Sequence, residues 1–179
     1  VGHLLQYHPV FIKLKDIVQS KVLGKIKYIY SNRMSFGKIR SFENVIWSFA
    51  PHDISMVLSL IDQIPRKVSV NSMSILQKDI EDISDIHLYF KNNVMARISV
   101  SWLNPEKEQK LVVIGEKGMM IFDDVLPWGQ KLKYIDYEYD YSSSPPVIKK
   151  KDPQNINVEQ SEPLKNDCKY FIDLIDGKE

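Results

Sequence analysis

Hydrophobic residues recur at helical spacing in residues 9–23, 48–62 and 162–175. Apolar side chains three and four positions apart form one stripe, which is the pattern of a helix with one buried face. Pro9 stands where the first helix can begin, and Gly24 stands where it can end. The sequence therefore predicts three helices, one of them at the end of the chain.

The apolar period changes to two over most of the remaining chain, and this alternation predicts strands. The predicted strands are residues 25–34, 67–76, 83–90, 94–103, 109–114, 119–123 and 132–139. Asn92-Asn93 and residues 115–118 are turn sequences, because Asn and Gly tolerate positive φ. Strands joined by short turns pair antiparallel. We predict an α+β fold with a large, mainly antiparallel open sheet and helices on one face.

A chain of 179 residues can bury one core, so residues 1–179 are predicted to form a single domain. Residues 142–146 and 149–153, rich in Ser, Pro and Lys, form the linker-like part. The chain begins in an apolar stretch without an initiator Met and stops directly after a predicted helix. We therefore expect a domain that is truncated at both ends.

The second face of the predicted sheet has to be covered or polar. Met95, Trp102, Met119, Met120 and several tyrosines are more than one small helix layer needs. One interpretation is a homo-oligomer that forms through the open sheet face. The other is a sheet face that stays partly in contact with water.

The formal net charge of +1 gives no general attraction to nucleic acid or to an anionic membrane. No stretch approaches the ~20 apolar residues that cross a bilayer, and no signal peptide opens the chain.

The single cysteine, Cys168, excludes an intrachain disulfide and suits a reducing compartment, so we expect a cytoplasmic location. Cys168 falls in the apolar pattern of Leu164 and Phe171, which predicts buried packing, with a nucleophile as the alternative.

Three kinds of site lack support in the sequence. The seven glycines form no G-x-G-x-x-G motif, so no dinucleotide-binding (Rossmann) fold is predicted. The histidines His3, His8, His52 and His87 have no close Cys or His partners, so no metal site is predicted. No nucleophile-elbow sequence supports a catalytic serine.

His52 is the candidate for acid–base chemistry. With Ser48 as the N-cap of the predicted helix, Pro51 and His52 lie in its first turn. The positive end of the helix dipole disfavours imidazolium, so the pKa of His52 should be lowered. A neutral imidazole suits a general base. A first-turn histidine that only hydrogen-bonds a neighbouring strand explains the residue equally well.

Three segments carry a resemblance to a known family: GHLLQYHP at residues 2–9, LGKI at 23–26 and PHDI at 51–54. Together they resemble the C-terminal domain of the glucose-fructose oxidoreductase/inositol dehydrogenase (Gfo/Idh/MocA) family, up to about Asp124. In such enzymes an N-terminal Rossmann domain binds NAD or NADP, and a Glu-Lys-Pro segment just upstream supplies a lysine at the nicotinamide. The resemblance implies that both would precede Val1, which leaves no cofactor-binding residues in this chain.

The family pattern D-x-G-x-H-x-x-D implies that His52 exchanges a proton with the oxidised hydroxyl. In this chain the first aspartate is Ser48, the glycine is Ala50 and the last aspartate is Ser55. Any help from a carboxylate would then come from elsewhere, for example from Asp53. This variant resembles the branch of 3-dehydrogenases that act on UDP-linked N-acetylamino sugars.

The resemblance also implies a set of substrate-binding residues with polar side chains: Tyr7, Asn32, Arg33, Lys38, Arg40 and Asp53. A diphosphate or a sugar carboxylate needs fixed cations, and Arg offers a bidentate fork. Lys38 and Arg40 could equally be solvated loop charges. Trp47 could lie under a sugar or cap the core.

The functional hypothesis is the substrate-binding C-terminal domain of an NAD(P)-dependent oxidoreductase. The full protein would oxidise a sugar hydroxyl, at C3 of a UDP-linked N-acetylamino sugar, and the chain alone is expected to be inactive. The alternative is a non-catalytic binding or oligomerisation module of the same fold, which has no need of a tuned His52.

Overall fold

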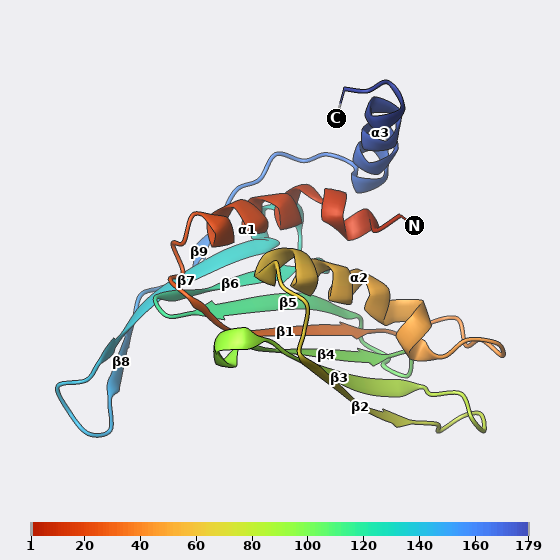
Figure 1. The fold of residues 1–179 in the computed structure, drawn as a ribbon, viewed down its shortest axis with the longest axis horizontal. Coiled ribbons are helices and arrows are strands. Elements are labelled where there is room, and N and C mark those ends of the chain that lie inside the picture. The colour runs from red at the N-terminus through yellow and green to blue at the C-terminus, as the bar shows by residue number, and fades with distance from the viewer. Residues whose placement is uncertain (1, 179) are drawn as a thin grey trace.

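One large sheet carries helices along one of its faces, as Figure 1 shows. The structure is a computed structural model that describes residues 2–178. The strands of these residues are β1 (Ile26–Met34), β2 (Lys67–Met73), β3 (Ile83–Tyr89), β4 (Met95–Ser101), β5 (Glu108–Gly115), β6 (Gly118–Asp123), β7 (Leu132–Asp140), β8 (Val147–Lys150) and β9 (Gln154–Asn155). The helices are α1 (Pro9–Gln19), α2 (Val45–Ile61) and α3 (Pro163–Ile175), and short 3-10 turns lie at η1 (Leu4–Tyr7), η2 (Lys91–Asn93) and η3 (Trp128–Gln130).

The strands are ordered β2-β3-β4-β1-β5-β6-β7-β8, and β9 pairs with β7. Among residues 2–178, the β1–β4 pair is parallel and every other strand pair is antiparallel. The prediction of an α+β fold with a mainly antiparallel open sheet is therefore confirmed. No helix within residues 2–178 is long and apolar enough to span a membrane.

Helices α1 and α2 cover the same face of the sheet, and the core lies between them and the strands. Alternation along β1 directs Ile29, Ser31 and Arg33 toward the helices and Tyr30 and Asn32 toward the other face. We call this other face the open face.

Four large side chains that suggested a covered second face divide between the two sides of the sheet. Trp102 and Met120 are buried in the core on the helix side. Met95 and Met119 lie on the open face, because Met95 pairs with Tyr28 and Met119 pairs with Ile114 across the strands. The open face is thus less apolar than the sequence suggested.

Helix α2 begins earlier than predicted, because Asn44 and not Ser48 is its N-cap. The Asn44 Oδ1 accepts from the Trp47 backbone N–H at 3.2 Å. Asn44 is held in turn by Glu81, whose Oε2 accepts from the Asn44 Nδ2 at 2.7 Å. The predicted first-turn position of His52 is therefore wrong: His52 lies about two turns inside the helix.

Helix α3 lies against η1, beyond the helices that cover the sheet (Figure 1). It has no buried residue, and Cys168 is exposed. The predicted buried packing of Cys168 is wrong, because α3 contacts a short turn at the edge of the molecule and does not lie over the sheet.

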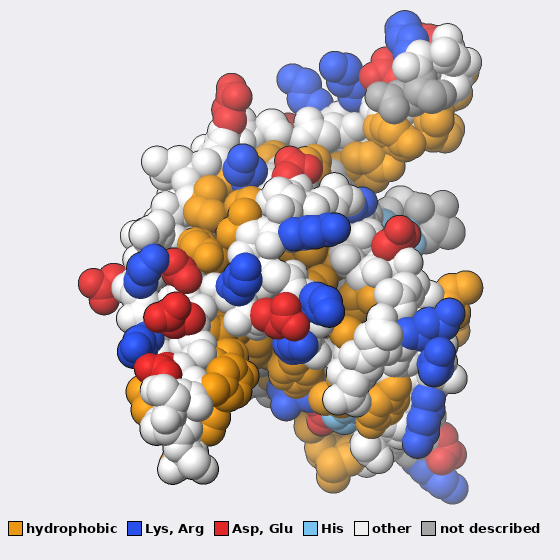
Figure 2. All heavy atoms as spheres, turned by 60° about the vertical axis from the view of Figure 1, so that its left-hand side comes forward, with side chains coloured by type: hydrophobic (Ala, Val, Ile, Leu, Met, Phe, Trp, Pro, Cys, Tyr) orange, Lys and Arg blue, Asp and Glu red, His pale blue; other side chains and the backbone are white. Residues whose placement is uncertain are grey.

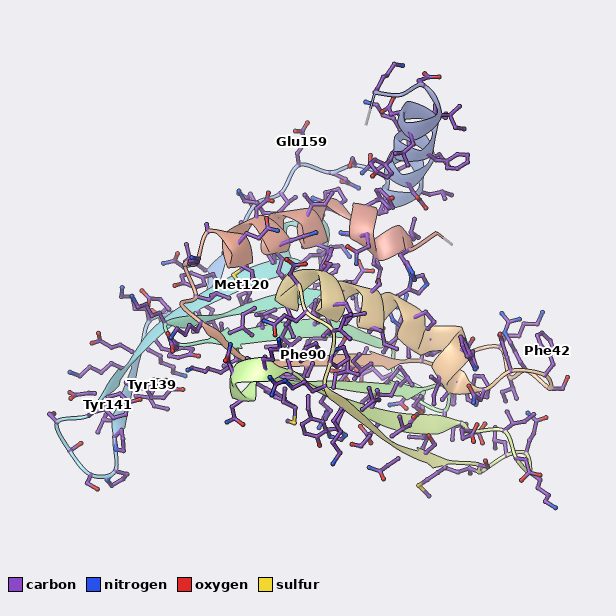
Figure 3. The ribbon with its side chains drawn as sticks, in the orientation of Figure 1. Phe42, Phe90, Met120, Tyr139, Tyr141 and Glu159 are labelled. Carbon is purple, nitrogen blue, oxygen red and sulfur yellow. The ribbon has the colours of Figure 1, made fainter. Side chains whose placement is uncertain are left out.

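Part of the predicted linker is ordered as a strand. Strand β8 pairs with the end of β7, and the two form an arm that projects from the sheet (Figure 3). Tyr139 and Tyr141 lie along this arm, with their ring centroids 6.2 Å apart. Figure 2 shows acidic, basic and hydrophobic side chains mixed on this side of the molecule.

A buried polar cluster ties the start of α1 to the β6–β7 connection. The His8 Nδ1 accepts from the Val10 backbone N–H at 3.2 Å, and the His8 Nε2 lies 3.4 Å from the Asp124 Oδ1. The Lys131 Nζ lies 2.7 Å from the same oxygen. Burial raises the pKa of Asp124, but hydrogen bonds from His8 and Lys131 outweigh burial and lower it to about 2.

We expect the contribution of Asp124 to stability to depend on pH. An unfolded Asp has a pKa of about 3.9, so the lowered pKa of the folded state stabilises the protein above pH ~4. This stabilisation is lost as pH falls from about 4 to about 2. The urea midpoint of Asp124→Asn should lie below that of the wild type at pH 6, and the difference should shrink toward pH 2. A difference that stays constant over this range would contradict the prediction, and Asp16→Asn, at an exposed position, is the control.

Candidate functional site

A cavity of about 510 Å³ opens beside His52. The end of β1, helix α2 and the turn between β4 and β5 supply its walls. Its polar lining consists of Arg33, Ser35, Ser48, His52, Lys107 and Gln109, and Phe36 and Phe49 supply the aromatic part. Hydroxyl, amide and cationic groups around an aromatic wall suit a polar ligand of sugar size.

Arg33 reaches the cavity from β1 and is held in place by Asp53. The Arg33 Nε donates to the Asp53 Oδ2 at 2.5 Å, and the Ser31 Oγ donates to the Asp53 Oδ1 at 2.5 Å. The Asp53 side chain is 1% exposed and that of Arg33 is 12% exposed. Asp53 does not line the cavity. The structure thus places Asp53 beneath the cavity wall, as the anchor of Arg33.

The pKa of His52 is lowered, as the sequence predicted, but the cause is different. Burial is the largest cause, the positive charge of Arg33 adds to it, and the negative charge of Asp53 partly offsets both. The helix dipole acts within the first turn, so it does not explain the shift at a residue two turns into α2. The lowered pKa of His52 favours the neutral imidazole at neutral pH.

The two ring nitrogens of His52 have different surroundings. The Nδ1 is buried and has no hydrogen-bond partner within the part of the chain that the structure describes. His3 lies on one side of the ring, with the two ring centroids 6.5 Å apart. A buried, unpartnered Nδ1 leaves the Nε2 as the nitrogen that can exchange a proton with a ligand.

Of the predicted substrate-binding residues, the structure brings Arg33 to the cavity with His52. Asn32 lies on the open face, where its Nδ2 donates to the Glu108 Oε1 at 2.9 Å and its Oδ1 accepts from Arg97 at 3.3 Å. Consecutive residues of a strand point to opposite faces, so Asn32 and Arg33 are on opposite sides of the sheet. The predicted role of Asn32 in binding at His52 does not fit this placement.

Three more predicted residues lie away from the cavity. Lys38 is exposed in the loop of residues 35–44. Arg40, in the same loop, pairs with Glu43 at 2.5 Å. Tyr7 packs against Tyr170 of α3, with ring centroids 5.4 Å apart. None of the three lines the cavity beside His52.

Trp47 does not cap the core, because 74% of its surface is exposed. It lines an apolar groove of about 310 Å³ on the outer side of α2, together with His3, Pro51 and Ile54. This groove is separate from the cavity that Arg33 and His52 line.

Lys107 and Gln109 line the cavity but were not predicted. Strand β5 lies next to β1, and the register places Gln109 opposite Arg33. Lys107 precedes β5 in the turn that follows β4. A period-two pattern shows that a strand exists but does not show which strands are neighbours, so the sequence offered no signal for either residue.

The sequence profile described as the GFO/IDH/MocA C-terminal domain matches residues 11–121. No curated protein matches the sequence. Similar solved structures include a protein from Magnetospirillum magnetotacticum MS-1 that carries the name oxidoreductase, with 26% identity and a TM-score of 0.77 over 96% of this chain and 53% of the other.

The UDP-N-acetylglucosamine 3-dehydrogenase GnnA from Acidithiobacillus ferrooxidans has the same fold, with 17% identity and a TM-score of 0.79 over 99% of this chain and 54% of its own. An oxidoreductase from Pseudomonas syringae shows 14% identity and a TM-score of 0.68 over 93% of this chain and 48% of its own. The chain spans about half the length of these structures.

Proposed function

The chain belongs to the GFO/IDH/MocA family through the C-terminal domain that residues 11–121 match, and we propose that it is the substrate-binding part of an NAD(P)-dependent sugar dehydrogenase. The observation that carries the proposal is His52, a histidine with a lowered pKa at the wall of a polar cavity. Perturbed titratable groups beside a cavity are typical of acid–base sites.

In the proposed reaction a secondary hydroxyl becomes a ketone. The hydroxyl proton passes to the His52 Nε2, and the hydrogen on carbon leaves as a hydride. Arg33 orients the substrate from the side of β1, since Asp53 and Ser31 fix its guanidinium group. His52 accepts the proton because it is neutral at working pH.

Hydride acceptance is the chemistry that NAD or NADP supplies when bound. Within residues 2–178 the sheet is mainly antiparallel and no glycine-rich turn joins a strand to a helix, so these residues do not fit a dinucleotide-binding fold. We propose that the cofactor is bound mainly by an N-terminal domain outside this chain.

We propose C3 of a UDP-linked N-acetylamino sugar as the position that is oxidised. Support comes from the polar, cationic lining of the cavity and from the shared fold of the UDP-N-acetylglucosamine 3-dehydrogenase. Fold alone does not determine the substrate, so the lining of the cavity is the stronger of the two supports. A cytoplasmic location, where nucleotide sugars and nicotinamide cofactors are both present, is part of the same proposal.

The test is turnover by a protein in which this chain is joined to its nucleotide-binding domain. UDP-N-acetylglucosamine and its C6 carboxylate form are incubated with NAD or NADP, and reduced nicotinamide is followed by absorbance. Turnover with either sugar, and none from this chain alone, supports the proposal. If neither sugar is turned over, the proposed substrate is wrong. If the chain alone turns over a sugar, the proposal that a separate domain binds the cofactor is wrong.

A second proposed role is self-association through the open face. Tyr28, Tyr30, Met95 and Met119 lie there half-buried beside the polar residues Asn32, Arg97 and Glu108. A mixed face of this kind suits an isologous interface between two copies. We expect light scattering to give a dimer or larger mass that Tyr30→Glu reduces. A monomer mass at all concentrations for the unchanged chain would contradict it.

A further inference from the structure

The cavity beside His52 has an electrostatic character that hydride transfer alone does not require. Two of its wall residues, Arg33 and Lys107, are cations. Among the described residues that line it, none is Asp or Glu. Hydroxyl and amide groups complete the polar wall. A neutral sugar hydroxyl does not require two cationic donors at the wall, whereas a bound anion is stabilised by them.

Arg33 contributes a fixed donor. Its Nε bonds to the Asp53 Oδ2, and its Nη2 lies 3.4 Å from the Asp53 Oδ1. Asp53 uses one edge of the guanidinium group, and the planar fork leaves further N–H donors for a ligand. Because the anchor is buried, the free donors of Arg33 keep one orientation.

Lys107 contributes a cation that is not neutralised nearby. It is exposed and forms no ion pair with any residue from 2 to 178. Other lysines near the same end of the sheet are paired: Lys110 with Asp123 at 3.1 Å and Lys131 with Asp124 at 2.7 Å. An unpaired lysine at a cavity wall can meet the charge of a ligand.

The acidic neighbours of Lys107 in the sequence do not neutralise it. Glu108 accepts a hydrogen bond from Asn32 on the open face, on the other side of the sheet from the cavity. Glu106 does not line the cavity beside His52; it lines a second cavity with Lys110 and Asp123, and Lys107 lines both cavities. Within residues 2–178 Lys107 forms no ion pair with Glu106 or Glu108, so its charge can meet a ligand on the His52 side.

We propose that Arg33 and Lys107 form an anion-binding subsite next to His52, which receives a carboxylate or phosphate group of the sugar derivative. The inference rests on the proposed function and specifies how this chain recognises its substrate. In this proposal Arg33 and Lys107 take the place of the loop residues Lys38 and Arg40 as the cations of the site, since neither loop residue lines the cavity. Both groups are oxyanions, so the residues that bind them are the same and the ligand series has to distinguish them.

The experiment compares the unchanged chain with Lys107→Gln by calorimetric titration. The two probes are UDP-N-acetylglucosamine and UDP-N-acetylglucosaminuronic acid, which differ by one carboxylate. Every wall residue of the subsite belongs to this chain, so the chain alone is the material. Lys91→Gln, in η2 at the other end of β3 and β4, is the matched control, and circular dichroism confirms that each variant is folded.

If the subsite holds the carboxylate, Lys107→Gln weakens binding of the uronic acid about ten-fold and leaves the neutral sugar unchanged. If it holds the phosphates, both ligands weaken about ten-fold. Equal affinities of the unchanged chain and Lys107→Gln for both ligands would overturn the subsite. Absence of binding by the unchanged chain would overturn it too, while turnover by the joined protein still decides the proposed function separately.

Discussion

Replacing His52 by Asn should lower kcat of the joined protein by about 10²- to 10⁴-fold, the usual contribution of a positioned general base. The amide keeps a polar side chain of smaller size at the cavity wall but cannot accept the hydroxyl proton. Because the loss lies in proton transfer, KM should change much less than kcat. Steady-state rates with saturating sugar and cofactor measure the effect. Retention of full activity would remove His52 from the reaction.

The pH dependence of the unchanged protein adds a second readout at His52. The base has to be neutral, so kcat/KM should fall as pH drops through the pKa of His52 in the free protein. Burial and Arg33 lower that pKa, so the acid limb should lie below the ordinary value of 6.5. Ser59→Ala is the control for the substitution, because Ser59 is on α2 and donates to the Met56 carbonyl at 3.3 Å without lining the cavity.

Replacing Asp53 by Ala should destabilise the fold by about 3 kcal/mol, because it leaves the guanidinium group of Arg33 largely buried and without its partner. The substitution also removes one acceptor of the Ser31 hydroxyl, which keeps the Lys110 carbonyl at 3.1 Å. Urea denaturation followed by circular dichroism gives the free energy of unfolding. Asp16→Ala, at an exposed position of α1, should stay within ~0.5 kcal/mol of the unchanged chain.

A double variant separates the charge from the packing at this position. Arg33→Met combined with Asp53→Leu removes both charges and keeps apolar volume, so much of the lost stability should return. The double variant should still fail to bind an anionic ligand. If Asp53→Ala is as stable as the unchanged chain, the Arg33–Asp53 pair does not hold β1 and α2 together.

The sequence predicted the sheet well, because alternation on a half-buried sheet is a strong signal. Each of the seven predicted strands corresponds to one of β1 to β7, and three predicted helices correspond to α1, α2 and α3. Strand β8 was not predicted, and its Lys149 and Lys150 were assigned to the linker-like part; all four residues of β8 are exposed, so no buried face produces an alternating pattern. The start of α2 was misplaced because Ser48 was taken as the N-cap, whereas the structure has Asn44 there, held by Glu81 from a distant part of the chain.

The candidate site was predicted in part, and the limits have physical reasons. His52 and Arg33 were identified from residue chemistry and family resemblance, and the structure places them at one cavity. The period of a strand could already have separated Asn32 from Arg33, since neighbours on a strand face opposite ways. The place of Lys107 at the cavity could not be predicted, because it depends on which strand lies beside β1. Lys38 and Arg40 lie in an irregular loop, and the course of such a loop produces no periodic pattern in the sequence.

The central place of β1 has a consequence for how the protein is made. Strand β1 comes first in the chain, but its neighbours β4 and β5 come much later, and its pairing with β4 is parallel. Contacts between distant segments slow folding, because the intervening chain loses conformational entropy before the contact contributes any stabilising free energy. We therefore expect the strand that carries Arg33 to stay unpaired during synthesis until β4 has left the ribosome, with its second edge open until β5 follows. The cavity beside His52 takes wall residues from β1, α2 and β5, so it cannot be complete before β5 is made.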